Sequence, residues 1–299
     1  MSAAVTTTST TSSASAIPEA TTLGQRALRR LLRDRHVIVC FSIIAVYVGI
    51  AACGYLGILA DFQQRIGGSY DRPELSLLKF LGTDVFGRSV FLKILAGTQT
   101  AMTLGFVVTI IEIPIGVALG AIAGYYGGRI DGFIVWLYSV IVSVPYILLL
   151  VAISFVLGKG LLSICLAMGL VDWVGICRLI RGEVMRQKDL DYVSASRLLG
   201  ASDRVLIFRH ILPNVMHLAI NTASLSVLGA IKAEVILTYI GVGVQTGASW
   251  GAMISDAPGE LVNGIWWPLV GVVVAMFLIV YALNVAGDAL RDALDPKIL

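Results

Sequence analysis

The sequence predicts an all-α membrane protein with six transmembrane helices. Two compositional observations support this fold class, because 57 % of the 299 residues are hydrophobic and only 14 % are charged. A third is that the apolar residues fall into separate runs, each long enough to cross a bilayer as a helix. The mean hydropathy of +0.87 agrees with these observations. Together they exclude a soluble domain of ordinary composition.

Six apolar runs define the predicted spans. The first has 23 residues without a charge, about 34 Å of helix, which is longer than the apolar part of a cleaved signal peptide. An even number of spans places both termini on the same side of the membrane. The predicted spans are residues 37–59, 102–124, 133–157, 161–180, 218–240 and 267–286.

Two segments of different composition precede the first span. Residues 1–22 contain five Ser, seven Thr and five Ala, which cannot bury a core and predict a disordered cytoplasmic tail. Residues 23–36 carry five Arg and a stripe of three leucines, which predict an amphipathic helix on the cytoplasmic membrane surface. We expect the transmembrane domain to occupy residues 37–299.

The distribution of Lys and Arg predicts the orientation. With the amino terminus inside, 15 of the 22 Lys and Arg residues lie on cytoplasmic segments, seven of them in the connection 177–217. Six lie outside, five of these in the outer loop 60–101, and Lys232 lies within a span. Because segments rich in Lys and Arg stay on the cytoplasmic side, both termini are expected in the cytoplasm.

Small residues and a proline suggest how two spans pack. Gly116, Gly120 and Gly124 recur at intervals of four in the second span, which gives a smooth ridge against which another helix backbone can pack closely. Pro145 lies within the third span and removes one backbone hydrogen bond, so it predicts a kink there.

The segment 191–214 is the most informative part of the connection 177–217. Its first residues predict a short helix with Tyr192, Ala195 and Leu199 on one face. Gly200 ends this helix, because glycine readily adopts the left-handed conformation that closes one.

A second helix is expected to start at Ser202 or Asp203, which are both good N-caps, and to end at Pro213. Two helices joined at a glycine form a bent projection between two spans. A small apolar face on it could contact a soluble partner, and its cations could hold that partner.

This segment resembles the EAA loop of ABC importer permeases, in which a Glu-Ala-Ala triplet is followed by Gly four residues after its last Ala and by Leu-Pro near the end. In this chain residues 194–196 read Ser-Ala-Ser, Gly200 has the same spacing and residues 212–213 are Leu-Pro, while the family's glutamate has no counterpart. The resemblance implies that the segment contacts an ATPase. The residues implied in this coupling are Tyr192, Ser194, Ala195, Ser196, Arg197, Gly200, Ala201, Ser202, Leu212 and Pro213.

Three further stretches are similar to the second permease subunit of oligopeptide and dipeptide importers, in the peptide/nickel family. They are FLGTDVFGRSV from Phe80, GAIAGYYGGRID from Gly120 and GVGVQTGASWGAMISDA from Gly241, with Ser89 where the family has Asp. The resemblance covers about residues 25–299. It implies the type I ABC importer permease fold and the import of dipeptides or oligopeptides.

The resemblance also implies partners and a location. We expect a homologous permease forming a heterodimer with this chain, two ATPase subunits that bind ATP and Mg, and an extracytoplasmic solute-binding protein, at a bacterial inner membrane. The sequence contains no G-x-x-x-x-G-K-[ST] phosphate loop, so ATP hydrolysis is assigned to another polypeptide. We expect no catalytic residue, cofactor or metal on this chain, and no nucleic acid partner.

Charged residues near the middle of two predicted spans are candidates for a translocation pathway. Glu112 lies in the second span, and Lys232 and Glu234 lie in the fifth. Charges at such depth are costly and mark translocation pathways. One hypothesis pairs Lys232 with Glu112 or Glu234, since opposite charges at similar depth relieve each other. The alternative is that each is covered separately, by snorkelling or by a partner subunit.

Other functions fit the sequence less well. An importer of nickel or another small solute has similar subunits. An ion-coupled secondary transporter could use Glu112, Asp172 and Lys232 as a relay, but it would need inverted repeats, which are not evident. A passive channel or scaffold lacks a visible polar filter. Residues 247–251 match the G-x-S-x-G pattern of hydrolases, which requires a strand-turn-helix setting that a helical bundle does not provide.

Overall fold

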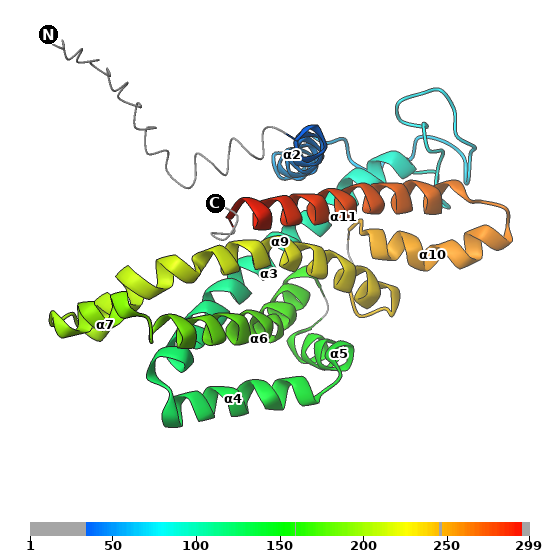
Figure 1. The fold of residues 1–299 in the computed structure, drawn as a ribbon. Helices are drawn as coiled ribbons and strands as arrows, with labels where there is room; N and C mark the ends of the chain where they lie inside the picture. Colours follow the sequence, from blue (N-terminus) through cyan, green and yellow to red (C-terminus); the bar gives the residue numbers. More distant parts are fainter. Residues whose placement is uncertain (1–33, 159, 245–246, 295–299) are drawn as a thin grey trace, which may run out of the picture.

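The chain folds as a bundle of long helices in the computed structural model, which describes residues 34–158, 160–244 and 247–294 (Figure 1). Within these ranges the structure has no named strand, only two isolated bridges near the start of α3. In the described part of the chain, five helices are long and apolar enough to cross a membrane. They are α2 (Arg35–Tyr55), α3 (Val90–Tyr126), α6 (Leu161–Gln187), α9 (Leu212–Tyr239, continuous with helix from Asp203) and α11 (Trp267–Leu294).

A bent pair of helices supplies the sixth span. The sequence predicted one kinked helix over 133–157, whereas the structure has α4 (Gly128–Ser143) and α5 (Tyr146–Leu157), which meet at 92°. The cause is Pro145, which has no N–H and forces Val144 into an extended conformation with ψ of 134°. The all-α class and up to six spans are therefore confirmed, and the third span is broken.

The glycine ridge of α3 lies directly against α6, as predicted. A Cβ atom on Gly120 would lie 2.6 Å from the carbonyl oxygen of Cys177, and one on Gly124 would lie 2.7 Å from that of Arg181. Gly116 has the same relationship to Trp173, at 2.8 Å. Only glycine permits this backbone contact, which fixes α3 and α6 as the central pair of the bundle.

Helix α3 begins twelve residues before the predicted span, so the last part of the proposed outer loop 60–101 is helical. Ser89 is the N-cap, and its hydroxyl accepts a hydrogen bond from the N–H of Leu92. The added turns are held by packing, since Val90 and Ile94 are buried. Hydropathy alone missed them because Lys93 and several polar residues interrupt the apolar run.

Helix α10 (Trp250–Val262) lies in a region that was expected to be a loop. Ser249 is its N-cap and is fully buried, which gives the serine of the G-x-S-x-G match a structural role. The buried indole of Trp250 donates a hydrogen bond to the carbonyl of Ile94 at 3.2 Å, and this bond ties α10 to the start of α3. The helix escaped prediction because it contains Pro258 and two acidic residues.

The predicted tail 1–22 lies outside the described residues, and so does most of the predicted surface helix 23–36. Its last residues are described, and there α2 already begins, at Arg35. The side chain of Asp34 caps this helix by accepting from the N–H of His36 at 2.9 Å. From this point one continuous helix crosses the bundle.

Candidate functional site

The connection between α6 and α9 forms an elbow, residues 188–211, at one end of the molecule (Figure 1). It consists of a turn at 188–190, helix α7 (Asp191–Leu198), a second turn at 199–202, the single turn α8 (Asp203–Val205) and a π-helical stretch, η1 (Leu206–Ile211). The predicted loop 177–217 is therefore helical over most of its length, because α6 and α9 both extend into it.

Gly200 closes α7 as predicted. Its φ is +85°, and the N–H groups of Gly200 and Ala201 donate to the carbonyls of Arg197 and Ser196. These two hydrogen bonds form a Schellman motif, the arrangement in which a left-handed residue satisfies the last carbonyls of a helix. The turn after α7 is thus fixed by backbone geometry.

The predicted end of the second helix at Pro213 is wrong, because helix continues from Asp203 to Tyr239. The π-helical stretch explains how the proline is accommodated. The N–H of Leu212 donates to the carbonyl of Ile207, five residues back, so the helix is widened immediately before a residue that has no N–H. As a result, the part of the elbow from Asp203 onward and the fifth span form one continuous helix.

Helix α7 is anchored to the bundle by a face that differs from the predicted one. Val193 is fully buried among the apolar residues of η1 and α6. The Tyr192 hydroxyl donates to the Gln187 side chain at 2.7 Å and accepts from the Asn214 amide at 3.1 Å. Tyr192 therefore bridges α6 and α9, whereas Leu199, predicted to share its face, is 89 % exposed.

Polar contacts tie the elbow to neighbouring helices as well. The Tyr125 hydroxyl at the end of α3 donates to the Asp203 carboxylate at 2.6 Å. The Lys188 ammonium donates to the carbonyl of Gly124 at 3.1 Å. With the Tyr192 bonds, these contacts connect the elbow to α3, α6 and α9.

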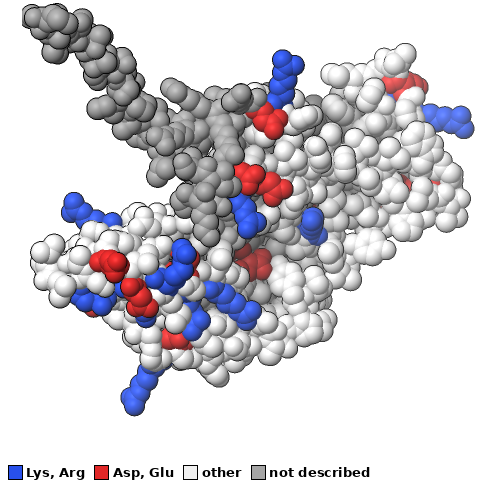
Figure 2. Space-filling view, viewed as in Figure 1, with Lys and Arg blue, Asp and Glu red and all other residues white. Residues whose placement is uncertain are grey.

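The outer surface of the elbow is apolar at its tip and charged around it. Leu198 and Leu199 are each 89 % exposed, and Phe208 is 68 % exposed. Figure 2 shows that Lys, Arg, Asp and Glu gather at this end, with smaller groups of charged residues elsewhere on the visible face. Of the residues implied in coupling, Tyr192, Ser194, Ala195, Arg197, Gly200, Ser202 and Pro213 are exposed, and Ser196, Ala201 and Leu212 are half-buried.

A separate polar cavity of about 400 Å³ lies between α3, the α5 start, α6 and α9. Glu112 and Asp172 contribute carboxylates to it, and Tyr146 donates a hydrogen bond to Asp172 at 3.2 Å. Sequence reasoning placed Glu112 in the pathway and Asp172 only in a rejected alternative. What it missed was that the break at Pro145 brings Tyr146 beside them.

The hypothesised pairing of Lys232 is not formed among the described residues. Glu112 and Glu234 are buried, whereas Lys232 is exposed on the other face of α9 and makes none of the described ion pairs. Glu234 instead accepts a hydrogen bond from the Thr238 hydroxyl at 2.8 Å. Positions 232 and 234 are about 200° apart on a helix, which explains their separation.

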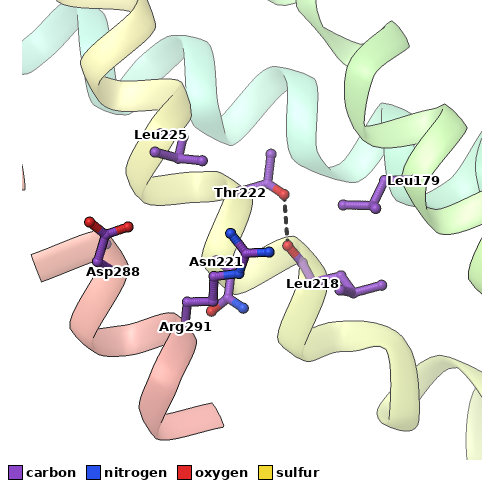
Figure 3. A pocket seen from close by; sticks show the side chains of 8 residues that line it. Leu179, Leu218, Asn221, Thr222, Leu225, Asp288 and Arg291 are labelled. Carbon is purple, nitrogen blue, oxygen red and sulfur yellow. Dashed lines mark hydrogen bonds between the residues drawn. The ribbon is translucent and has the colours of Figure 1, made fainter. Parts of the chain in front are cut away.

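A smaller cavity of about 200 Å³ continues from the polar one between α9, α6 and the end of α11. The two cavities share Thr222 and Leu225. Figure 3 shows Arg291 of α11 extending toward Asn221 of α9, while Thr222 hydrogen-bonds back to the Leu218 carbonyl at 2.7 Å. The two cavities therefore lie along one side of α9, from Glu112 and Asp172 toward the elbow.

The stretch from Phe80, which resembles a family tag in its sequence, folds around Asp84. This carboxylate is buried, accepts from the N–H groups of Phe86 and Arg88, and lies 3.4 Å from the Lys93 ammonium. Nearby, the Gly68 N–H and the Lys79 ammonium lower the pKa of Asp71. These contacts hold the 56–89 segment against the start of α3.

Comparison with known proteins identifies the family of this chain. Residues 116–299 match the model of a family described as binding-protein-dependent transport system inner membrane component. The chain belongs to this family. It is a multi-pass permease of an ABC importer, and membership implies partners of two kinds, an ATPase and a substrate-binding protein.

Curated relatives match this permease over most of its length. It is 39 % identical to the dipeptide transport system permease protein DppC of Bacillus subtilis, over 92 % of this chain and 86 % of the relative. It is 34 % identical to the oligopeptide permease OppC of the same organism, over 92 % and 90 %. The glutathione transport system permease GsiD of Pectobacterium atrosepticum is also 34 % identical, over 90 % of each chain.

A solved structure supports the fold. An inward-facing structure of the MetNI methionine ABC transporter is similar with a TM-score of 0.50 and 20 % identity, covering 68 % of this chain and 93 % of that one. This likeness concerns architecture alone, and it agrees with the type I importer permease fold that the sequence predicted.

Proposed function

We propose that this permease moves dipeptides or oligopeptides into the cytoplasm. Relatives named for dipeptide and oligopeptide transport align with 92 % of the chain, and the match includes both the elbow and the polar cavity. The observation that carries the coupling part of the proposal is the exposed leucine pair, Leu198 and Leu199, at the end of α7, a helix that Tyr192 ties to α6 and α9.

The orientation follows from charge. The connection 177–217 and the α3–α4 junction carry eight of the 22 Lys and Arg residues, and such segments remain on the cytoplasmic side. This orientation puts the elbow and both termini in the cytoplasm, and it puts the 56–89 segment and α10 on the opposite side. An inner membrane location with this topology presents the elbow to soluble ATPases.

The proposed assembly has a second, homologous permease, two ATPase subunits that bind ATP and Mg, and an extracytoplasmic solute-binding protein. The leucines at the tip of the elbow fit an apolar groove on an ATPase, and Arg197 and Arg204 beside them can pair with acids at its rim. Closure of the ATPases around ATP would then displace α7.

Because Asp203 to Tyr239 is one helix, displacement of the elbow moves the wall of the polar cavity. This relationship gives alternating access a mechanical basis. The binding protein delivers the solute on the outer side, the cavity changes its opening when the ATPases close, and hydrolysis resets it. The chain supplies the pathway and the coupling, and the ATPases supply the energy.

Reconstitution tests the proposal. The chain is co-expressed with a candidate partner permease, ATPases and binding protein from the same organism, purified and placed in lipid vesicles. We expect binding protein plus a dipeptide to stimulate ATP hydrolysis and to drive uptake of the labelled dipeptide. Nickel and glutathione are tested in parallel. Uptake of one of these with no uptake of dipeptide would replace the substrate assignment, and full-rate import without ATPases would contradict the coupling.

A further inference from the structure

The polar cavity contains an acceptor that the chain itself leaves unused. Glu112 is 2 % exposed, and its Oε1 atom is buried without a hydrogen-bond partner. Ser226 lines the same cavity. A buried carboxylate oxygen without a donor is costly, and native structures satisfy such atoms with a partner, a water or a ligand. Glu112 is one of the residues that line the cavity, so its side chain borders that space.

A second carboxylate faces the same space. Asp172 lines the cavity and accepts one hydrogen bond, from Tyr146, which leaves further acceptor positions open. The lining residues include no Lys or Arg. Arg178 lines the neighbouring cavity with Asp172, but its guanidinium lies over the ring of Tyr138, 4.6 Å from the centroid. The cavity is therefore acidic, and its acceptors lack an internal cation.

We propose that Glu112 and Asp172 form a subsite for the ammonium group of the solute, a proposal that rests on the proposed function. A primary ammonium has three N–H donors, so one such group in the cavity can donate to both of the carboxylates that line it. Every unmodified peptide carries such a group at its amino terminus. Recognition of this group is independent of side-chain sequence, which suits a carrier of varied peptides.

The dimensions of the cavity favour a peptide end over a bare metal ion. A volume of about 400 Å³ accommodates an amino-terminal residue with its side chain. Divalent cations such as Ca²⁺ are held by six or more oxygen ligands at short range, and only two carboxylates line this space. Thr222 and Leu225 continue the path toward the second cavity, where the rest of a peptide can lie.

The first arm of the test measures transport by the reconstituted complete transporter. Glu112→Gln and Asp172→Asn keep side-chain size and remove the charge, and we expect each to lower alanyl-alanine uptake by about tenfold. Asp256→Asn, the same change on an exposed residue of α10, serves as the control and should import at the parental rate. Parental uptake by both cavity variants would overturn the subsite.

The second arm detects occupancy without relying on the binding protein. An apolar carbodiimide modifies buried carboxyl groups, and mass spectrometry quantifies the adduct on Glu112 in the assembled transporter. Alanyl-alanine should slow this modification severalfold, whereas N-acetyl-alanyl-alanine, which lacks the ammonium group, should not. Equal protection by both compounds, or protection by Ni²⁺ and not by the dipeptide, would overturn the proposal. If Glu112 is not modified in either state, the transport arm decides.

Different results would contradict the import of dipeptides and the ammonium subsite. A parental transporter that imports no dipeptide contradicts the proposed function, whatever the carbodiimide shows. A parental transporter that imports dipeptide, with cavity variants that match it and no ammonium-dependent protection, contradicts the subsite alone.

Discussion

The hydroxyl of Tyr125 donates a hydrogen bond to the carboxylate of Asp203 at 2.6 Å, and this bond joins the last turn of α3 to the first residue of the helix that becomes the fifth span. Tyr125 is buried and Asp203 is exposed, so the bond is formed at the boundary between bundle and solvent. It connects the central glycine-packed pair of helices to the elbow.

Tyr125→Phe removes this bond and keeps the ring. We expect a loss of about 1 kcal/mol in stability, because the acceptor is solvated, and a larger effect on coupling, measured as dipeptide imported per ATP hydrolysed. Tyr126→Phe is the matched control, since no hydrogen bond of the Tyr126 hydroxyl is described within residues 34–294. The role assigned to Tyr125 is wrong if both variants retain parental coupling.

Gly200→Val should uncouple ATP hydrolysis from uptake. At φ of +85° a residue with a side chain costs about 1–2 kcal/mol, although nothing lies within 4 Å of the added Cβ. The strain is relieved by reorienting the turn after α7, so the elbow leaves its place while the spans insert normally. Vesicle uptake and ATPase rate are measured together.

Gly182→Val is the control for this change. Gly182 lies within α6, also has open space around its Cβ, and has an ordinary helical backbone on which Val is tolerated about as well as Gly. Parental uptake by Gly200→Val would show that the conformation of the turn is not needed for coupling.

Leu198 and Leu199 are expected to bind the ATPase. Replacing both with Ser removes apolar surface that is 89 % exposed in the chain, so the fold should be unaffected. Burial of the pair in an interface would contribute about 3 kcal/mol, so ATPase affinity should fall by about 100-fold in co-purification or titration. Leu75→Ser, at a fully exposed leucine of the 56–89 segment, should leave ATPase affinity unchanged. Loss of affinity in both variants would point to a general defect.

Several features of the fold could be predicted from the sequence, because each depends on residues whose local chemistry permits few conformations. Hydropathy located the spans, the spacing of Gly116, Gly120 and Gly124 predicted a close helix contact, and Gly200 predicted the end of α7. Each of these inferences rests on local chemistry that tertiary structure did not override.

The remaining features depend on contacts between distant residues. Pro213 reads as a helix end unless the widened turn before it is known, and α10 is stabilised by Trp250 against α3, 156 residues away. The buried face of α7 was misassigned because Val193 is the one residue of this helix that is buried. Leu198 and Leu199, which hydrophobicity alone would place in the core, are exposed. Charges at similar depth suggested a pair, but depth does not determine which face of α9 carries Lys232.

Gly120→Val tests the central helix contact. The Cβ of the new side chain would lie 2.6 Å from the Cys177 carbonyl oxygen and 3.0 Å from the Cβ of Ile180, so α3 and α6 must separate. Overpacking of this kind costs about 1–3 kcal/mol, and we expect a lower thermal midpoint in detergent together with reduced yield. Gly132→Val in α4, where no atom lies within 4 Å, controls for the loss of a glycine. Equal midpoints for the two variants would mean that α3 and α6 are not held in backbone contact.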